Sequence, residues 1–174
     1  QGFYRLREFN QAELQIFFDP DRLDEHSEFE KIKDVSLRMF PLQNRASGEV
    51  DEVKASELHK NYGIPKFYIY HLVKIQEFYL DKMNFPRELF RFRELSEDER
   101  AFYNKIHWDV ELFTESLNGY KEMGGLHYRT DYDLNGHQNA SGEKLEVNIE
   151  GKKMIPHVLE LSFGVDRNFW TLLD

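Results

Sequence analysis

The sequence predicts an α+β fold in which a mostly antiparallel β-sheet is flanked by helices. Segments with alternating apolar and polar residues predict strands, and segments with apolar residues three or four positions apart predict helices. Few of these segments follow the strand–helix–strand order of a parallel sheet. The chain has 174 residues, of which 40% are hydrophobic and 15% aromatic. This size and composition predict one packed domain.

The first half of the chain is expected to open with a half-buried strand over residues 4–18. Its even positions are mostly apolar, its odd positions are mostly polar, and Asp19-Pro20 ends the alternation. The charged stretch 21–33 is expected to be a loop or a short solvated helix. Four segments follow in order: a strand over 35–39 ended by Pro41, a polar loop over 44–51, a short helix over 55–62, and a longer helix after Pro65 to about residue 83.

The second half is expected to contain more strands than helices. Phe90 and Phe92 alternate with arginines as in a strand with a buried aromatic face. Ser96 and Glu99 have the spacing of a capping box and predict that a helix begins there. The remaining segments are, in order: strands over 107–115 and 120–128, a helix from 130 to about 137, a strand over 144–149 turned at Glu150-Gly151, a strand over 158–164, and a buried helix over 169–173.

Composition limits the classes of function. The formal net charge of -9 argues against indiscriminate nucleic-acid binding, so any RNA has to be recognised locally. The absence of cysteine excludes disulfides and thiolate zinc sites, and the scattered histidines form no metal-binding motif, which argues against a structural metal. No apolar run reaches the roughly 20 residues of a membrane span, and residues 1–5 lack the apolar core of a signal peptide. We therefore expect a cytoplasmic protein without membrane association.

The odd positions of the first predicted strand carry groups that suit a nucleotide. Arg5 and Arg7 can bind phosphate oxygens, Phe9 can stack on a base, and Glu13 can hold an ammonium group. A solvated strand face with incidental charges explains the same residues. The pattern leaves both interpretations open.

The segment from Val158 to Arg167 predicts a strand with a second working face. Glu160, Ser162 and Gly164 point to one side of this strand, while the leucines between them point into the core. Arg167 is expected in the first turn of the following helix, beside Gly164, where it can clamp an anion. Alternatively, Arg167 only pairs with Asp166, and the polar residues are ordinary surface positions.

Three further motifs are ambiguous. Residues 129–133, Arg-Thr-Asp-Tyr-Asp, are as compatible with a Thr-capped helix start as with a functional site. Glu122 is a lone acid in a glycine-flanked strand and gains weight only if magnesium is required. Residues 90–93, Phe-Arg-Phe-Arg, look superficially like an RNA-binding surface, but a strand with a buried aromatic face explains them better.

Taken together, these stretches resemble the catalytic domain of class II aminoacyl-tRNA synthetases, specifically the glycyl-tRNA synthetases. Residues 5–13 resemble the second half of the class's motif 2, and residues 160–167 resemble its motif 3. Residues 129–134, Arg-Thr-Asp-Tyr-Asp-Leu, are close to a signature of the glycine enzymes, and residues 93–95 and 99–103 also look like that family. The family usually has Pro where Leu161 stands, and a small residue followed by an acid or Asn at 127–128.

The resemblance implies roles for individual residues in a reaction of glycine with ATP. Arg5 and Arg167 would be catalytic, with Arg167 on the γ-phosphate; Phe9 would stack on adenine, and Glu122 would bind Mg²⁺. The implied ATP contacts are Tyr4, Arg5, Leu6, Arg7, Glu8, Phe9, Glu122, Met123, Gly164, Val165, Asp166 and Arg167. The implied glycine contacts are Phe9, Glu13, Glu160 and Ser162.

The resemblance further implies transfer of glycine from its adenylate to tRNA(Gly) by an enzyme that is a homodimer in its complete form. Residues 1–174 would be a partial catalytic domain, from within motif 2 to motif 3, without an anticodon-binding domain. We expect this piece to be inactive by itself. Two alternatives stay open: a non-catalytic synthetase-like paralogue or accessory binding subunit, and a class II synthetase for another small amino acid.

Overall fold

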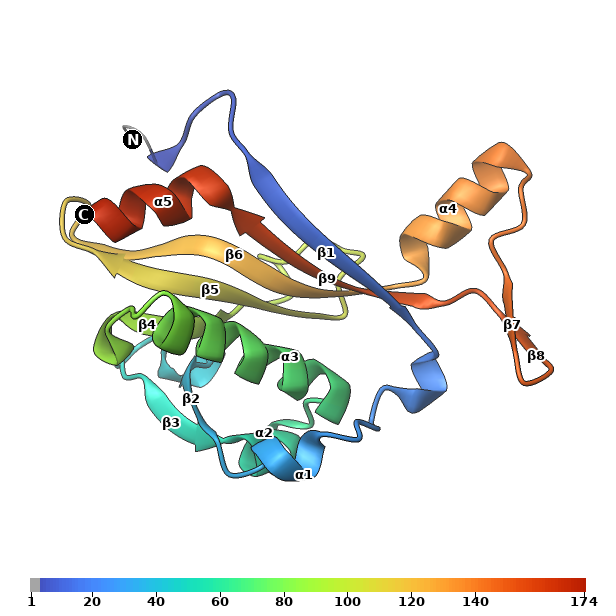
Figure 1. Ribbon diagram of the computed structural model, residues 1–174, viewed down its shortest axis with the longest axis horizontal. Helices are drawn as coiled ribbons and strands as arrows, with labels where there is room; N and C mark the ends of the chain where they lie inside the picture. The colour runs from blue at the N-terminus through green and yellow to red at the C-terminus, as the bar shows by residue number, and fades with distance from the viewer. Residues whose placement is uncertain (1–3) are drawn as a thin grey trace.

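A seven-stranded sheet organises the molecule (Figure 1). The structure is a computed structural model that describes residues 4–174. The prediction that residues 1–5 do not begin a signal peptide rests partly on Gln1–Phe3, which lie outside the described residues. In spatial order the strands are β1 (Gln11–Phe18), β9 (His157–Gly164), β6 (Gly119–Thr130), β5 (Ile106–Thr114), β4 (Phe90–Glu94), β2 (Ser36–Phe40) and β3 (Asp51–Lys54). All neighbouring pairs are antiparallel except β2 with β4. The predicted α+β class with a mostly antiparallel sheet is confirmed.

Helix α3 (Lys66–Glu77) lies across one face of this sheet and builds the core with it (Figure 1). Leu72 and Tyr68 of α3 are fully buried, as are Phe90 and Phe92 of β4. Because successive strand residues point to opposite faces, the residues between these aromatic rings point away from the core. The sheet therefore has an apolar face under α3 and a polar face opposite.

The remaining elements are short. Helices α1 (Phe29–Ile32) and α2 (Ala55–Tyr62) pack near α3, which continues into a π-helical turn at Phe78–Lys82. Short 3₁₀ turns occupy Pro20–Arg22, Leu42–Asn44 and Arg87–Leu89. Helix α4 (Tyr132–Ser141) and the two-stranded sheet of β7 (Val147–Ile149) and β8 (Lys152–Met154) extend from one end of the large sheet, and α5 (Val165–Leu173) follows β9 (Figure 1).

Most predicted elements occur where the alternation or helical spacing placed them. Helix α2 coincides with the predicted range, and α3 with its π-helical turn covers nearly all of the predicted longer helix. The predicted turn at Glu150-Gly151 is also present, with positive φ at both residues. None of the helices within residues 4–174 combines the length and the apolar character that a bilayer crossing requires.

The predicted first strand is wrong over its N-terminal half, because β1 begins only at Gln11. Residues before it bind elsewhere: Tyr4 is buried against Trp170, and Asn10 bonds to the start of α5. The remaining strand lies at the sheet edge, so Leu14 is 54% exposed and only the far end of the apolar side is partly buried. Because β1 lies at the edge of the sheet, its apolar residues are less buried than the alternation of apolar and polar residues predicts.

Two predicted helices differ from the structure. Ser96 and Glu99 form a turn, but no helix follows, because the Glu99 carboxylate also accepts hydrogen bonds from Arg45 and Arg93 and the chain turns into β5. Helix α5 is present but is not buried, since Phe169 is 65% and Leu173 is 74% exposed. This helix lies at the end of the sheet, where only one of its sides meets the core.

Smaller differences affect the connecting segments. Helix α1 is short but not solvated, because Phe29 and Ile32 are buried. Helix α4 begins at Tyr132, since Thr130 has φ of 59° and ends strand β6. Strand β3 follows the predicted polar loop, and the predicted strand 144–149 shortens to β7. Each difference lies where polar residues give a weak alternation signal.

Candidate functional site

A cleft of about 370 Å³ opens where the N-terminal segment passes over the ends of β6 and β9 and the start of α5. Three segments that are far apart in the sequence line it. The lining residues are Tyr4, Arg5, Leu6, Phe9, Asn10, Gln11, Glu122, Met123, Gly124, Ser162, Gly164, Asp166 and Arg167. The cleft thus brings together many of the residues for which the sequence predicts contacts with ATP.

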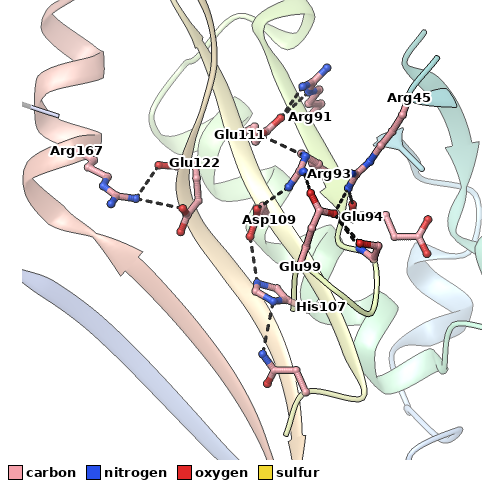
Figure 2. Close-up of polar contacts among 12 residues, drawn as sticks. Arg45, Arg91, Arg93, Glu94, Glu99, His107, Asp109, Glu111, Glu122 and Arg167 are labelled. Carbon is pink, nitrogen blue, oxygen red and sulfur yellow. Dashed lines mark hydrogen bonds and ion pairs between the residues drawn. The ribbon is translucent and has the colours of Figure 1, made fainter. Parts of the chain in front are cut away.

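Arg167 and Glu122 form the charged pair of the cleft (Figure 2). Nη1 of Arg167 lies 3.4 Å from Oε2 of Glu122 and donates to the Glu122 carbonyl oxygen at 3.2 Å. The guanidinium also lies 4.7 Å from the centre of the Tyr4 ring. Arg167 stands in the first turn of α5, as predicted, but its carboxylate partner is Glu122 and not Asp166.

Tyr4 anchors the N-terminal segment at the base of the cleft. Its hydroxyl donates to the Glu122 carbonyl oxygen at 2.5 Å, and its ring meets Trp170 edge-on at 6.4 Å. Burial raises the pKa of Tyr4 to about 12, although the nearby Arg167 charge opposes this shift. Tyr4 therefore remains a neutral hydrogen-bond donor at physiological pH.

Asp166 ties the N-terminal segment to α5. Its carboxylate accepts hydrogen bonds from the backbone and side-chain nitrogens of Asn10, and these bonds lower its pKa. The Val165 amide donates to the Asn10 carbonyl at 2.9 Å, and Gln11 donates to the Ser162 hydroxyl at 2.5 Å. These bonds fix the wall of the cleft that carries Arg5 and Phe9.

Three of the four candidate glycine contacts, Glu13, Glu160 and Ser162, share one side of the β1–β9 pair. Glu13 lies directly opposite Ser162, and Gln15 lies directly opposite Glu160, so all four side chains point to the same face. Glu160 is buried, with Oε2 3.2 Å from Nη1 of Arg129 and accepting from Gln15 at 3.2 Å. A buried carboxylate with these partners is held in one orientation.

Arg129 joins Glu160 to the start of α4. Its Nε donates to Asp133 at 2.7 Å, and this hydrogen bond is the main cause of its raised pKa. The predicted role of residues 129–133 as the start of a helix is correct in part, since Asp131 and not Thr130 precedes α4. Arg129 additionally holds the predicted glycine contact Glu160, which local sequence reasoning did not identify.

Several predicted site residues lie outside the cleft. Arg7, Glu8 and Glu13 are exposed and do not line it, and the buried Glu160 lies farther along β9. Val165 is 44% exposed and lines an apolar groove beside α3 instead. Their roles as ATP or glycine contacts stay predictions.

His127 is a candidate site residue that the sequence alone does not single out. It lies opposite Glu160 in the β6–β9 register, and its ring lies beside that of His107, with the ring centres 3.9 Å apart and the ring planes tilted by 47°. Burial, with the neighbouring His107 and Arg129, lowers the pKa of His127 to about 3. The register with Glu160, available once the sheet is known, is the signal that identifies it.

The polar face continues across β5 and β4 as a series of ion pairs (Figure 2). Arg91 pairs with Glu111 at 2.7 Å, and Arg93 pairs with Asp109 at 3.4 Å. Burial raises the pKa of Glu111, although Arg91 opposes the shift. The interpretation of residues 90–93 as a strand with a buried aromatic face is confirmed, because these arginines are engaged by acids of the same sheet.

Of the two carboxylates that line the cleft, Asp166 accepts hydrogen bonds from Asn10, which leaves Glu122 as the candidate to bind a metal ion. Glu122 is exposed there, and within residues 4–174 no group of three or more His, Cys, Asp or Glu side chains could hold a metal ion. Mg²⁺ commonly binds one or two carboxylates together with substrate phosphates and water. Glu122 thus fits a magnesium ion that arrives with a nucleotide and does not fit a resident ion.

The antiparallel sheet, with α3 on one face and a strand–Gly–helix turn that presents Arg167, is the partial catalytic core of a class II aminoacyl-tRNA synthetase. No family model matches the chain. Its curated relatives include the glycine–tRNA ligase of Pyrococcus furiosus, which is 30% identical in an alignment that covers 100% of this chain and 44% of the relative. The glycine–tRNA ligase of Pyrococcus abyssi is 40% identical, with 88% of this chain and 27% of the relative covered.

The glycine–tRNA ligase of Methanothermobacter thermautotrophicus is 42% identical, with 86% of this chain and 26% of the relative covered. The chain therefore belongs to the glycine–tRNA ligase family. It spans less than half the length of these relatives. The recognition of this family from residues 5–13, 129–134 and 160–167 is confirmed.

Proposed function

We propose that this chain forms part of the active site of a glycine–tRNA ligase. In the first reaction a carboxylate oxygen of glycine attacks the α-phosphorus of ATP, and pyrophosphate leaves as glycyl-adenylate forms. In the second, a ribose hydroxyl at the 3′ end of tRNA(Gly) attacks the glycyl carbonyl, and AMP leaves. The observation that supports this proposal best is the cleft in which Arg5, Glu122 and Arg167 meet from three distant segments.

The proposed ATP site relies on charge neutralisation and alignment. In-line displacement at phosphorus needs little acid–base chemistry from the protein, but positioned positive charge stabilises the transition state. Arg5 and Arg167 supply this charge, and the exposed ring of Phe9 can stack on adenine. We expect phosphate oxygens to replace the Glu122 carboxylate as the partner of Arg167.

Once phosphate oxygens replace Glu122 as the partner of Arg167, the Glu122 carboxylate would be available to Mg²⁺ bound to the ATP phosphates. Such an ion would supply additional neutralisation of phosphate charge. The protein's own part is to hold Glu122 near the phosphates, which the Tyr4 and Arg167 bonds to its backbone carbonyl do. These contacts stiffen the strand without using the carboxylate oxygens.

The proposed glycine site lies along β9 next to the cleft. Glu160 and Glu13 can accept hydrogen bonds from the ammonium group; Ser162 stands between Glu160 and the cleft and lies directly opposite Glu13. Selection of glycine is a steric problem, because the site must fill the space that a larger side chain would occupy. The His127 ring, opposite Glu160 in the sheet register, is suited to fill it.

The proposal extends to the setting of the complete enzyme. We infer that it binds tRNA(Gly), glycine and ATP, works as a homodimer and serves cytoplasmic protein synthesis. The names of the relatives support the tRNA and the amino acid. The homodimer and the compartment rest on the family resemblance of the sequence.

Pyrophosphate exchange tests the proposal in the complete enzyme that contains this chain. We expect glycine-dependent exchange of pyrophosphate into ATP, and a loss of roughly a hundredfold or more in Arg167→Ala, the range seen when one transition-state donor is removed. Arg22→Ala is the matched control, because Arg22 is exposed, pairs with Glu25 and does not line the cleft. Exchange that does not depend on glycine, or that survives Arg167→Ala unchanged, contradicts the proposal.

The same assay separates the alternatives. Exchange driven by another small amino acid in preference to glycine would indicate a different class II specificity. ATP binding without any exchange would indicate a synthetase-like binding module.

A further inference from the structure

An exposed cluster of three aromatic rings lies at the opposite end of the polar face from the nucleotide cleft. Phe102 and Tyr103 come from the turn before β5, and Tyr132 is the first residue of α4. Phe102 is 83% exposed and Tyr132 is 48% exposed. The Phe102 and Tyr132 rings meet edge to face at 5.2 Å, and Tyr103 stacks on Tyr132 at 5.7 Å. We call these three residues the aromatic platform.

Arg129 connects the aromatic platform to the proposed glycine site. Its guanidinium lies 4.5 Å from the centre of the Tyr103 ring, and the same group binds Glu160 and Asp133. One side chain therefore separates the platform from Glu160. Along β9 the order is Glu160, Ser162 and Gly164, and the latter two line the nucleotide cleft.

Large exposed rings are unusual unless they meet a partner, and their geometry suits a planar one. Base stacking on an aromatic side chain is tolerant of sequence and needs no positive charge from the protein. This suits a chain with a net charge of -9, which repels phosphates on average. Asp131 and Asp133 flank Tyr132, so a base is a better occupant here than a phosphate group.

We propose that the aromatic platform stacks an unpaired nucleobase near the 3′ end of the acceptor RNA. The inference rests on the proposed function, because transfer requires the terminal ribose to approach the glycyl carbonyl beside Glu160. With the nucleotide at the Gly164 end of β9, the RNA end enters from the Arg129 end. Stacking on Phe102 and Tyr132 holds the strand as it makes this approach.

Fluorescence titration of the 174-residue chain with two RNA hairpins tests the proposal. One hairpin ends in a four-nucleotide single-stranded 3′ extension whose terminal base is 2-aminopurine, and the other has the same stem with a blunt end. Phe102→Leu and Tyr132→Leu keep apolar bulk but remove the aromatic face. Phe169→Leu is the matched control, because Phe169 is 65% exposed on α5, outside the platform.

We expect Phe102→Leu and Tyr132→Leu each to weaken binding of the extended hairpin by about tenfold, within the range of one lost base–aromatic stack, and not to change binding of the blunt hairpin. Phe169→Leu should bind the extended hairpin as the unchanged chain does. Equal affinity of Phe102→Leu and the unchanged chain overturns the proposal. An equal loss on both hairpins, or no binding of the extended hairpin by the unchanged chain, also overturns it.

Sedimentation of the same proteins tests whether the rings instead contact a second copy of the chain. Self-association that disappears in Phe102→Leu, without any RNA binding, would mean that the rings form a protein contact and would overturn the proposal. Pyrophosphate exchange by the complete enzyme uses no RNA and so reports on the proposed function separately. If the extended hairpin binds in a way that depends on Phe102 but the complete enzyme shows no exchange, the synthetase reaction is contradicted. The proposal that the aromatic platform stacks a nucleobase is then still supported.

Discussion

At the scale of single residues, His127 is positioned by a side-chain hydrogen bond and by the neighbouring ring of His107. The Asn104 side-chain amide lies 3.3 Å from Nδ1 of His127 and 3.5 Å from Nδ1 of His107. The amide nitrogen can only donate, so Nδ1 of each ring accepts, and the neutral His127 ring carries its proton on Nε2. A Cβ built on Gly125 would lie 2.8 Å from Nε2 of His127, so the ring is folded over the backbone of its own strand.

Replacement of His127 should therefore change amino-acid selection. In His127→Ala the space opposite Glu160 opens, and we expect the preference for glycine over alanine to fall by about 10- to 100-fold, the range that one methyl group in a pocket decides. The measurement is the ratio of exchange rates with glycine and with alanine in the complete enzyme. A ratio cancels any general loss of folded protein.

His137→Ala provides the comparison, because His137 is exposed on α4. A glycine-to-alanine ratio that is the same in His127→Ala and in the unchanged enzyme would show that another group fills the pocket.

At the scale of elements, the close approach of β6 and β9 depends on Gly124. A Cβ at this position would lie 2.4 Å from the Ser162 carbonyl oxygen and 2.6 Å from the Phe163 ring. Backbone atoms cannot yield as a flexible side chain can. The two strands that carry Glu122 and Ser162 are thus set at a spacing that only glycine permits.

We expect Gly124→Ala to lower the free energy of unfolding by about 1 to 3 kcal/mol, the usual cost of overpacking. Gly119→Ala, in the same strand, should have a smaller effect, because a Cβ there meets only the flexible end of Lys121 at 3.8 Å. Denaturant unfolding of both variants measures the difference. Equal stability of the two would mean that β6 and β9 can separate without cost.

The elements that sequence alone predicts are those with strong periodic signals. Helices α2 and α3 and strands β4, β5, β6 and β9 follow directly from the spacing of apolar residues. The N-terminal segment before Gln11 was misassigned because its alternation continues into residues that bond to Asp166 and Val165, which lie about 155 positions away. A contact at that sequence distance leaves no local pattern.

In the candidate site, too, some residues can be predicted from the sequence and others only from the arrangement of the strands. Arg5, Glu122 and Arg167 were identified from the motifs and do share one cleft. The pairing of Arg129 with Glu160, and the position of His127, depend on the β6–β9 register, which the sequence does not specify. The exposure of Glu13 follows from the edge position of β1, which is likewise a property of the sheet and not of the segment.

At the scale of the whole molecule, buried histidines make stability depend on pH. The pKa values of His26, His71, His127 and His157 are all lowered, with burial as the largest cause in each case. Between the lowered folded value and the unfolded value of about 6.5, the unfolded chain binds more protons than the folded chain. Stability from these rings is complete above about pH 6.5 and is lost as pH falls toward the folded pKa.

We therefore expect the free energy of unfolding to decrease as the pH is lowered from about 7 to about 5, a range in which most carboxylates stay ionised. Denaturant titrations at several pH values measure the slope. His127→Gln should reduce the slope, because one of the four neutral rings is then absent. Stability that is constant or rises on acidification would contradict the assignment of these rings as neutral.

The edge-on contact between Tyr4 and Trp170 gives the molecule an optical reporter. The chain has two tryptophans, and Trp108 is 2% exposed within the sheet, away from the cleft lining. In Trp108→Phe the emission would come from Trp170 alone, whose neighbour Tyr4 also touches Arg167. A nucleotide that draws Arg167 away from Tyr4 alters the electric field at this indole, so occupancy of the cleft becomes readable as a shift in emission without any attached dye.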